Sequence, residues 1–139
     1  MAVSFRPETL RGAGARPTAG MVDFRLARNS VVSEFRKARL SRLDVCDAHP
    51  ELLRVATHLG RPAPEPCPIC ESPALVHVTY VFGPRIPASG RAVSSQAEMV
   101  KLDRGNRELT AYVVEVCADC SWNHLVRSLP LGRRRRRET

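Results

Sequence analysis

Apolar residues recur at helical spacing in two neighbouring segments near the start of the chain. The first predicted helix covers about 29–41, with basic residues between its apolar positions. Those apolar positions are Val32, Phe35 and Leu40. The second helix is expected to begin with Asp47 as its cap and to stop at Gly60. Because only a short connection separates the two helices, we expect them to pack on each other as a helical hairpin over residues 21–60.

Three later segments are dense in β-branched and aromatic residues, a composition that predicts strands. These segments are residues 74–82, 108–116 and 121–131. Between the first two, Ser95 and Glu98 have the spacing of a capping box, which predicts an inserted helix at about 95–104. The predicted fold class is therefore α+β: a helical hairpin, followed over residues 61–132 by a three-stranded antiparallel sheet with an inserted helix.

The two ends of the chain show no such periodicity. Residues 1–20 are rich in Ala, Gly, Arg and Pro, and we expect this tail to be disordered. Residues 133–139, RRRRRET, form a second, basic tail that we also expect to be disordered. Net charge is +8 overall, yet residues 21–132 hold fourteen Lys and Arg against twelve Asp and Glu. A basic tail on a nearly neutral body predicts a non-specific electrostatic handle for nucleic acid.

Two kinds of apolar segment bear on the expected cellular compartment of the protein. No run of about eighteen apolar residues is present, so we expect no membrane partner. The N-terminal segment has no apolar core of the kind found in secretory signals. These features predict a cytoplasmic protein, in which paired cysteines hold metal more often than they form disulfides.

Two C-x-x-C pairs supply the strongest chemical signal, in the segments CPIC and CADC. The four cysteines are Cys67, Cys70, Cys117 and Cys120. Each pair can turn around one ion as a knuckle, and two knuckles place four thiolates at the corners of a tetrahedron, which suits Zn²⁺. The 46 residues between the pairs exceed the usual interval, and the inserted helix accounts for the excess. The sequence therefore predicts a four-cysteine zinc ribbon.

Other uses of these cysteines are weaker. An iron–sulfur cluster also takes four thiolates, a redox motif needs a βαβ context, and disulfides need an oxidising compartment. The fifth cysteine, Cys46, is best interpreted as a small buried apolar residue. The alternative is a reactive thiolate at a helix N-terminus, which the neighbouring Asp44 and Asp47 disfavour.

Aromatic residues on the predicted strands allow a second kind of site. Trp122 and His124 share one strand face, and together with Tyr80 or Tyr112 they would form a surface on which bases stack. The competing interpretation, which we favour, is that these rings pack the ribbon against the helical hairpin. No catalytic triad, carboxylate pair or phosphate loop is present in the sequence, which favours a protein that is not an enzyme.

Six segments together resemble a family of small actinobacterial zinc-ribbon proteins of undefined function, over about residues 21–132. The segments are VCDAHPELLR, CPIC, LVHVTYVFG, SGR…SS…AE, AYVVEVC and CSWNHLV. The resemblance implies that the four paired cysteines are the zinc positions and that Cys46 belongs to the helical motif. More distantly, the two knuckles resemble ribbons of transcription factors and ribosomal proteins, a likeness of fold that does not fix function.

These observations predict a non-enzymatic zinc-binding adaptor associated with the transcription or translation machinery, with a protein partner there. It would contact RNA or DNA through the basic tails and the ribbon face. The predicted contacts are Arg133, Arg134, Arg135, Arg136, Arg137, Trp122 and His124. The alternative is a protein–protein interaction module for a larger complex, which the nearly neutral body favours. A thiol-based sensor is a third class without distinctive sequence support, and the oligomeric state stays open.

Overall fold

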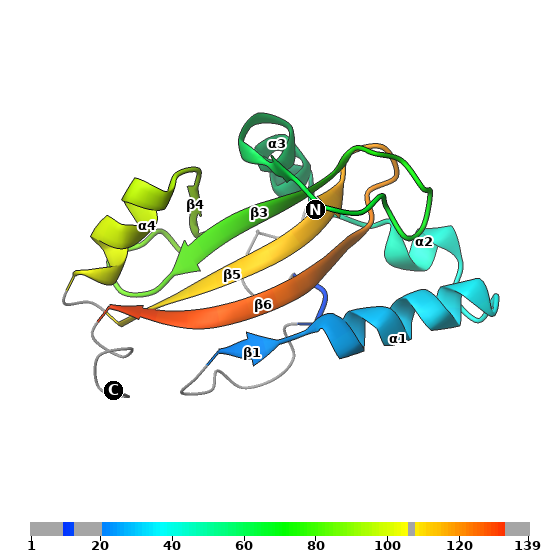
Figure 1. Ribbon diagram of the computed structural model, residues 1–139, viewed down its shortest axis with the longest axis horizontal. Helices are drawn as coiled ribbons and strands as arrows, with labels where there is room; N and C mark the ends of the chain where they lie inside the picture. Colours follow the sequence, from blue (N-terminus) through cyan, green and yellow to red (C-terminus); the bar gives the residue numbers. More distant parts are fainter. Residues whose placement is uncertain (1–9, 13–20, 106–107, 133–139) are drawn as a thin grey trace.

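The computed structural model describes residues 10–12, 21–105 and 108–132. Across these ranges the chain forms a mixed α+β fold with four helices and one six-stranded antiparallel sheet (Figure 1). The helices are α1 (Arg25–Arg36), α2 (Arg42–Val45), α3 (Pro50–Leu59) and α4 (Gln96–Asp103). The strands are β1 (Val22–Asp23), β2 (Arg61–Pro62), β3 (Leu75–Phe82), β4 (Arg91–Val93), β5 (Glu108–Cys117) and β6 (Asn123–Gly132).

Three long strands form the centre of the sheet. The sheet order is β1-β6-β5-β3-β2, and β4 pairs with β3 beside that path. β3, β5 and β6 correspond to the three predicted strands, which confirms the α+β class and the antiparallel arrangement of these segments. The short strands β1, β2 and β4 were not predicted, because two or three residues carry no readable alternation. A register irregularity between Val113 and Val114 interrupts the pairing of β5 with β6.

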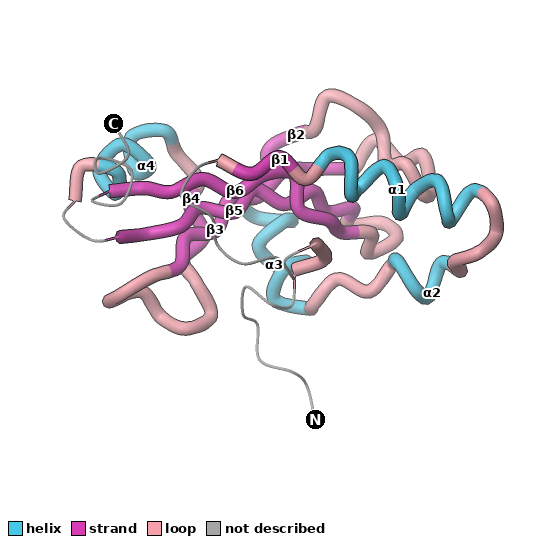
Figure 2. Tube along the Cα trace, turned by 90° about the horizontal axis from the view of Figure 1, so that it is seen from below, coloured by secondary structure: helices cyan, strands magenta, loops and turns pink. Residues whose placement is uncertain are grey.

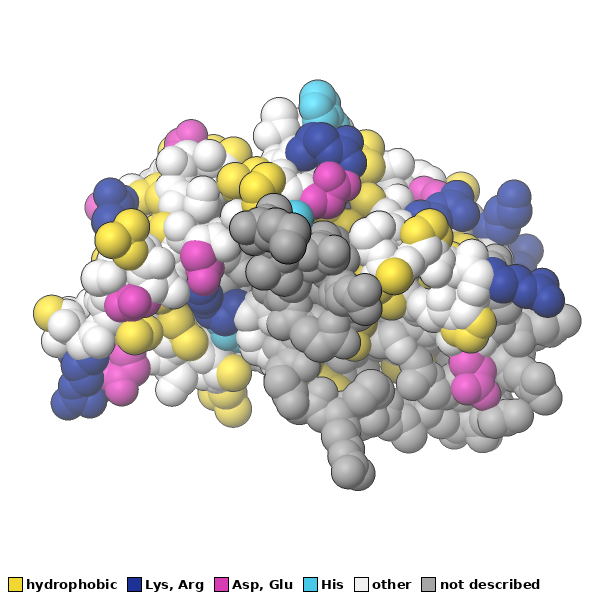
Figure 3. Space-filling model, turned by 180° about the vertical axis from the view of Figure 1, so that it is seen from behind, with side chains coloured by type: hydrophobic (Ala, Val, Ile, Leu, Met, Phe, Trp, Pro, Cys, Tyr) yellow, Lys and Arg dark blue, Asp and Glu magenta, His cyan; other side chains and the backbone are white. Residues whose placement is uncertain are grey.

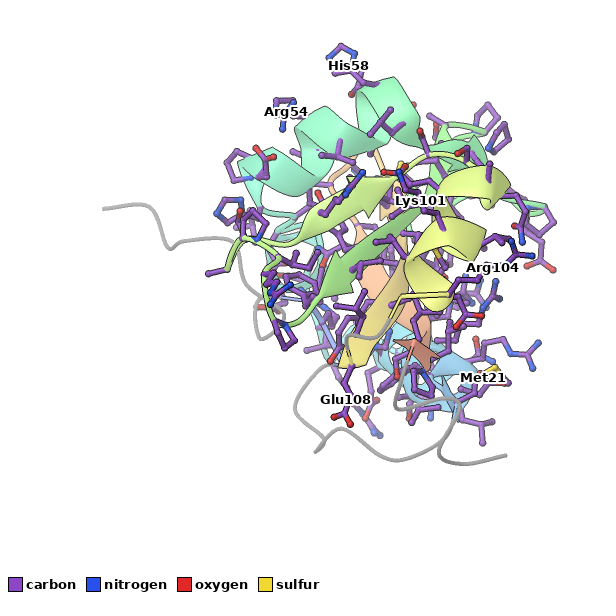
Figure 4. All side chains as sticks on the ribbon, turned by 90° about the vertical axis from the view of Figure 1, so that its left-hand side faces the viewer. Met21, Arg54, His58, Lys101, Arg104 and Glu108 are labelled. Carbon is purple, nitrogen blue, oxygen red and sulfur yellow. The ribbon has the colours of Figure 1, made fainter. Side chains whose placement is uncertain are left out.

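One face of the sheet is covered by α3. Successive strand residues alternate between faces, and Val78, Val114 and Leu125 point toward this helix and join its buried residues in one cluster. The buried residues of α3 are Leu52, Val55 and Ala56. The opposite side of α3 is polar, and Figure 4 shows Arg54 and His58 projecting outward from it.

The opposite face of the sheet is covered in two separate places. At one end, Leu102 of α4 packs with Val81 and Ala111. At the other end, Val32 of α1 packs with the cysteine knuckles and Trp122. Figure 2 shows α3 on one side of the sheet and α1 and α4 on the other.

The predicted helical hairpin is wrong. α1 packs on β6, whereas α3 packs on β3 and β5 from the other face. α1 begins at Arg25 and ends at Arg36, both earlier than expected, and the left-handed φ of 62° at Ala38 prevents the helix from continuing. The chain between the two helices passes through α2 and reaches the opposite side of the sheet. The sheet therefore separates two helices that their short connection suggested would pack together.

Of the two predicted helix N-caps, the structure confirms one and contradicts the other. The inserted helix is confirmed as α4, and Ser95 caps it by accepting a hydrogen bond from the Glu98 backbone N–H. The expected cap Asp47 is wrong, since α3 is capped by His49, whose Nδ1 accepts from the Glu51 N–H at 3.0 Å. Asp47 instead accepts a hydrogen bond from Asn123 Nδ2 at 3.1 Å, which ties this loop to β6.

Part of the N-terminal segment predicted to be disordered packs on the body. Leu10 is only 2% exposed, and the Leu125 N–H donates to the Arg11 carbonyl at 2.9 Å. Arg11 also forms an ion pair with Asp47. For residues 10–12 the prediction of disorder is therefore wrong. Residues 1–9, 13–20 and the basic tail 133–139 lie outside the described residues.

Within the described ranges, every helix is too short or too polar to cross a membrane.

Candidate metal centre

The two C-x-x-C pairs meet at one end of the sheet. Their four Sγ atoms all lie within 4.8 Å of one another. Cys67 Sγ lies 3.7 Å from Cys120 Sγ, and Cys70 Sγ lies 3.6 Å from Cys117 Sγ. A tetrahedral ion with metal–sulfur bonds of about 2.3 Å requires sulfur–sulfur edges of about 3.8 Å. A disulfide would instead bring two sulfurs to about 2.05 Å. The four thiols are therefore spaced to hold one metal ion.

Both knuckles have the same backbone geometry. In the first, the Glu71 N–H donates to the Cys67 carbonyl, and the Cys67 N–H donates to the Ser72 carbonyl, each at 2.9 Å. The second knuckle repeats both bonds at 2.9 Å with Cys117, Ser121 and Trp122. The repetition means that two segments far apart in the sequence present their sulfurs in equivalent ways.

A left-handed residue closes each knuckle. Glu71 has a φ of 64° and Ser121 a φ of 74°, so both occupy the region that favours glycine. The turn also directs the Ile69 N–H at Cys67 Sγ, at 3.4 Å, a contact that favours a thiolate. A hydrogen bond from the Ser72 hydroxyl to Asp119 joins the two knuckles to each other.

Sheet register brings the knuckles together. Cys67 and Cys70 precede β3, while Cys117 is the last residue of β5. Leu75 of β3 lies opposite Cys117 in the pairing of these strands. The predicted long interval between the pairs is consistent with this arrangement, because β4 and α4 lie between β3 and β5 along the chain.

Burial opposes ionisation of two of the thiols. It raises the pKa of Cys67 to about 11, and it also raises the pKa of Cys120. For Cys70, burial raises the pKa, but hydrogen bonds involving Ser72 and the neighbouring thiols lower it overall. A bound cation would supply the compensating charge, since coordination deprotonates a thiol outright. The donor set is therefore suited to a metal that prefers thiolates.

Cys46 lies beside this centre and is half-buried. It packs against the cluster that contains Trp122, and a hydrogen bond with Cys46 contributes to the raised pKa of Cys120. Cys46 caps the C-terminal end of α2, so it is not at a helix N-terminus, and the interpretation as a thiolate activated there is wrong. The geometry is that of a packing residue at the edge of the metal centre.

The predicted stacking surface does not exist in this conformation. Trp122 and His124 are 0% and 1% exposed, and their rings stack on each other with centroids 6.0 Å apart. His124 Nδ1 contacts the Leu125 carbonyl at 2.8 Å, and burial lowers the pKa of this imidazole. α1 and residues 10–12 cover these side chains. Tyr80 is also buried, in the cluster beneath α3 on the other face.

The remaining predicted contacts, Arg133 to Arg137, lie outside the described residues.

A buried ion pair beside the centre was missed from the sequence. Arg28 donates to both carboxylate oxygens of Glu115, at 2.8 and 3.1 Å, and Trp122 Nε1 donates to the same carboxylate at 2.8 Å. Glu115 is 4% exposed. A single acid inside the apolar segment YVVEVC is a signal of such a pair, since buried charges are almost always paired.

The chain is similar to known proteins of undefined function. Residues 16–139 match a family described as a family of unknown function, DUF5318. Uncharacterized proteins of Mycobacterium bovis and Mycobacterium tuberculosis are 40% identical over 111 residues, which cover 80% of this chain and 81% of each relative. No solved structure matches the chain. The predicted actinobacterial family of undefined function is thereby confirmed, and the chain belongs to the DUF5318 family.

Proposed function

We propose that the protein is a cytoplasmic, non-enzymatic adaptor of the zinc-ribbon type, whose fold is held by one Zn²⁺ on Cys67, Cys70, Cys117 and Cys120. The observation that carries this proposal is the approach of four Sγ atoms to within 4.8 Å, on two knuckles of matching geometry. Zinc accepts four thiolates in a tetrahedron, and such sites are usually structural.

A closed four-thiolate site has no open coordination position, so its work is stabilisation and not Lewis-acid catalysis. Structural zinc contributes on the order of 10 kcal/mol of apparent binding energy in small domains. That contribution is comparable to the whole stability of a typical domain. The proposed role of the ion is therefore to stabilise the folded state of the sheet end that carries the four cysteines.

Elemental analysis of purified, reduced protein tests the metal assignment. We expect about one zinc per chain, and we expect Cys46→Ala to leave this content unchanged, because the neighbouring four sulfurs already complete a tetrahedron. A folded, reduced sample without metal would exclude the site, and iron in place of zinc would exclude the zinc assignment.

The proposed partner is RNA or DNA within a transcription or translation complex. Support comes from the five arginines at 133–137 on a body that is nearly neutral. Figure 3 shows Lys and Arg side chains interspersed with Asp and Glu over one face of the described residues, which is unlike a dedicated phosphate-binding surface. The tail is therefore the stronger candidate for the electrostatic contact.

Deleting residues 133–137 tests this partner. If all five arginines engage phosphates, the slope of log K against log salt should flatten by about 3.5 to 4.5, depending on strand type. Full-length and truncated proteins would be titrated with a structured RNA and a DNA duplex at several salt concentrations. Zinc content and thermal stability should not change. Equal binding by both proteins would remove the nucleic-acid proposal.

A protein–protein interaction module is the second candidate, and one observation favours it. Leu26 on α1 and Leu43 on α2 are 86% and 88% exposed, so both apolar side chains are accessible to a partner protein. The test is capture of a partner from native lysate with nuclease present. Capture that survives nuclease and is lost with Leu26→Ser and Leu43→Ser would favour this candidate over the first.

A further inference from the structure

A cavity lies in the middle of the sheet face that α1 and α4 cover only at its ends. Its volume is about 610 Å³. Pockets for small molecules commonly measure about 300–1,000 Å³. The lining comes from β1, α1, the segment after β2, and the three long strands. The cavity is therefore built from segments across the whole width of the sheet.

The floor of this cavity is polar, and its charges are satisfied. Glu115 takes three hydrogen bonds, two from Arg28 and one from Trp122 Nε1. Asp23, at the β1 edge, is held by Arg25 through contacts of 2.6 to 3.0 Å. Neither acid needs a cation from a ligand.

Two other groups on the lining have hydrogen-bonding capacity to spare. Arg127 is exposed and has no ion-pair or hydrogen-bond partner for its side chain among the described residues, although its charge helps to lower the pKa of Asp23. His77 likewise has no side-chain partner within the described ranges, and burial lowers the pKa of its imidazole. Arg127 lies opposite Asp23 in the pairing of β1 with β6, but its guanidinium N–H groups have no acceptor among the described residues. Neutral His77 offers both a donor and an acceptor.

Apolar surface separates these groups from the far rim. Leu75 and Val126 are 3% and 8% exposed and line the cavity together with Ala63. Glu65 follows β2 and lies on the rim of the cavity. In strand order this rim is toward the opposite edge of the sheet from Arg127 on β6. The positive end of the cavity is thus the end at β6, with an apolar wall leading away from it.

We propose that this cavity binds a small organic anion. Its carboxylate or phosphate group lies at Arg127, and its apolar body lies against Leu75 and Val126. His77, on β3 beyond β5, offers a further hydrogen bond. Arginine is well suited to both anions because its planar fork donates two parallel hydrogen bonds. The site is separate from the four cysteines and does not depend on which partner the tail contacts.

The test uses the full chain with its metal, titrated with octanoate and with phenyl phosphate and followed by amide chemical shifts. We expect saturable binding of at least one of them, with shifts concentrated at residues that line the cavity. Octanamide has nearly the shape of octanoate without its charge, and it should bind at least about tenfold more weakly.

A matched pair of variants locates the anion. Arg127→Gln should weaken binding by at least about tenfold, because it removes a charged donor. Arg42→Gln, an exposed arginine outside the cavity, should leave binding unchanged. Because Arg127 is exposed, its variant should keep the wild-type spectrum elsewhere. The proposal is overturned if neither probe binds saturably, if octanamide binds as well as octanoate, or if both arginine variants behave alike.

Discussion

The two faces of the sheet are stabilised in different ways. Beneath α3, aliphatic side chains such as Leu52, Val78 and Val114 form one apolar cluster. On the other face, α4 covers one end and the cysteine knuckles with α1 cover the other. Between them lie the Arg28–Glu115 ion pair and a cavity.

The two faces therefore differ in which forces stabilise them and in which reactive groups they carry. An apolar face buries surface at a gain of about 25 cal/mol per Å², and it needs no special partner. A face with buried acids and thiols needs compensation for each polar group, here through an ion pair and a proposed metal ion. The groups able to contact a ligand are therefore concentrated on the second face.

The largest expected effect comes from the metal end. Cys67→Ser should leave the protein with substoichiometric metal and largely unfolded, since structural zinc is worth on the order of 10 kcal/mol. Circular dichroism and elemental analysis on one sample would measure both. Cys46→Ala is the matched control and should stay folded with full metal content. A stable, metal-free Cys67→Ser protein would show that both faces rest on apolar burial.

The next effect is on the face covered by α3. Leu52→Ala should lower the free energy of unfolding by about 2–5 kcal/mol, because Leu52 is 1% exposed and its loss leaves a cavity. Leu59→Ala on the same helix should cost less than about 1 kcal/mol, since Leu59 is 38% exposed. Denaturant titration measures both, with metal kept bound. Equal costs would mean that α3 does not seal this face.

The buried ion pair should have an intermediate effect. Glu115→Gln keeps the shape of the side chain but leaves the guanidinium of Arg28, only 18% exposed, without its counter-charge. We expect a loss of about 2–4 kcal/mol in the free energy of unfolding. The matched change at an exposed pair, Glu34→Gln beside Arg39, should cost less than about 0.5 kcal/mol. If the two variants cost the same, the polar face is more hydrated than its geometry indicates.

The smallest effect concerns the knuckle turns. Ser121→Gly should raise the free energy of unfolding by about 1 kcal/mol, because it relieves a left-handed φ of 74°. Ser30→Gly, at an exposed position within α1, should lower it by about 0.5–1 kcal/mol. Opposite signs in thermal or denaturant unfolding confirm the turn strain, and a loss at Ser121 contradicts it.

Local patterns predicted what local forces determine. The three long strands, the cap at Ser95 and the convergence of two C-x-x-C pairs follow from residue types and short spacings. The prediction of a helical hairpin is wrong because the face that a helix covers depends on the sheet. The sheet forms from segments that are distant in the sequence. Glu115 pairs with Arg28 across 87 positions, and no short window contains both.

The burial of the aromatic residues also depends on segments that are distant in the sequence. Alternation correctly places Trp122 and His124 together, and their rings stack. Alternation does not tell which face solvent reaches, because residues 10–12 and α1 arrive from elsewhere in the chain. The rings are packing residues and not a surface for bases, and they are covered by α1 and residues 10–12 instead of a helical hairpin.

The pairing of Leu75 with Cys117 has a consequence for assembly. Slipping one strand past its neighbour by a single residue turns every side chain to the opposite face. Such a slip between β3 and β5 would carry Cys117 away from the first knuckle and break the set of four sulfurs. An ion bound by both knuckles therefore stabilises one alignment of these strands over all others. Metal binding during folding would select the correct alignment of these strands. The supply of metal in the cell would then determine what fraction of the molecules reaches that alignment.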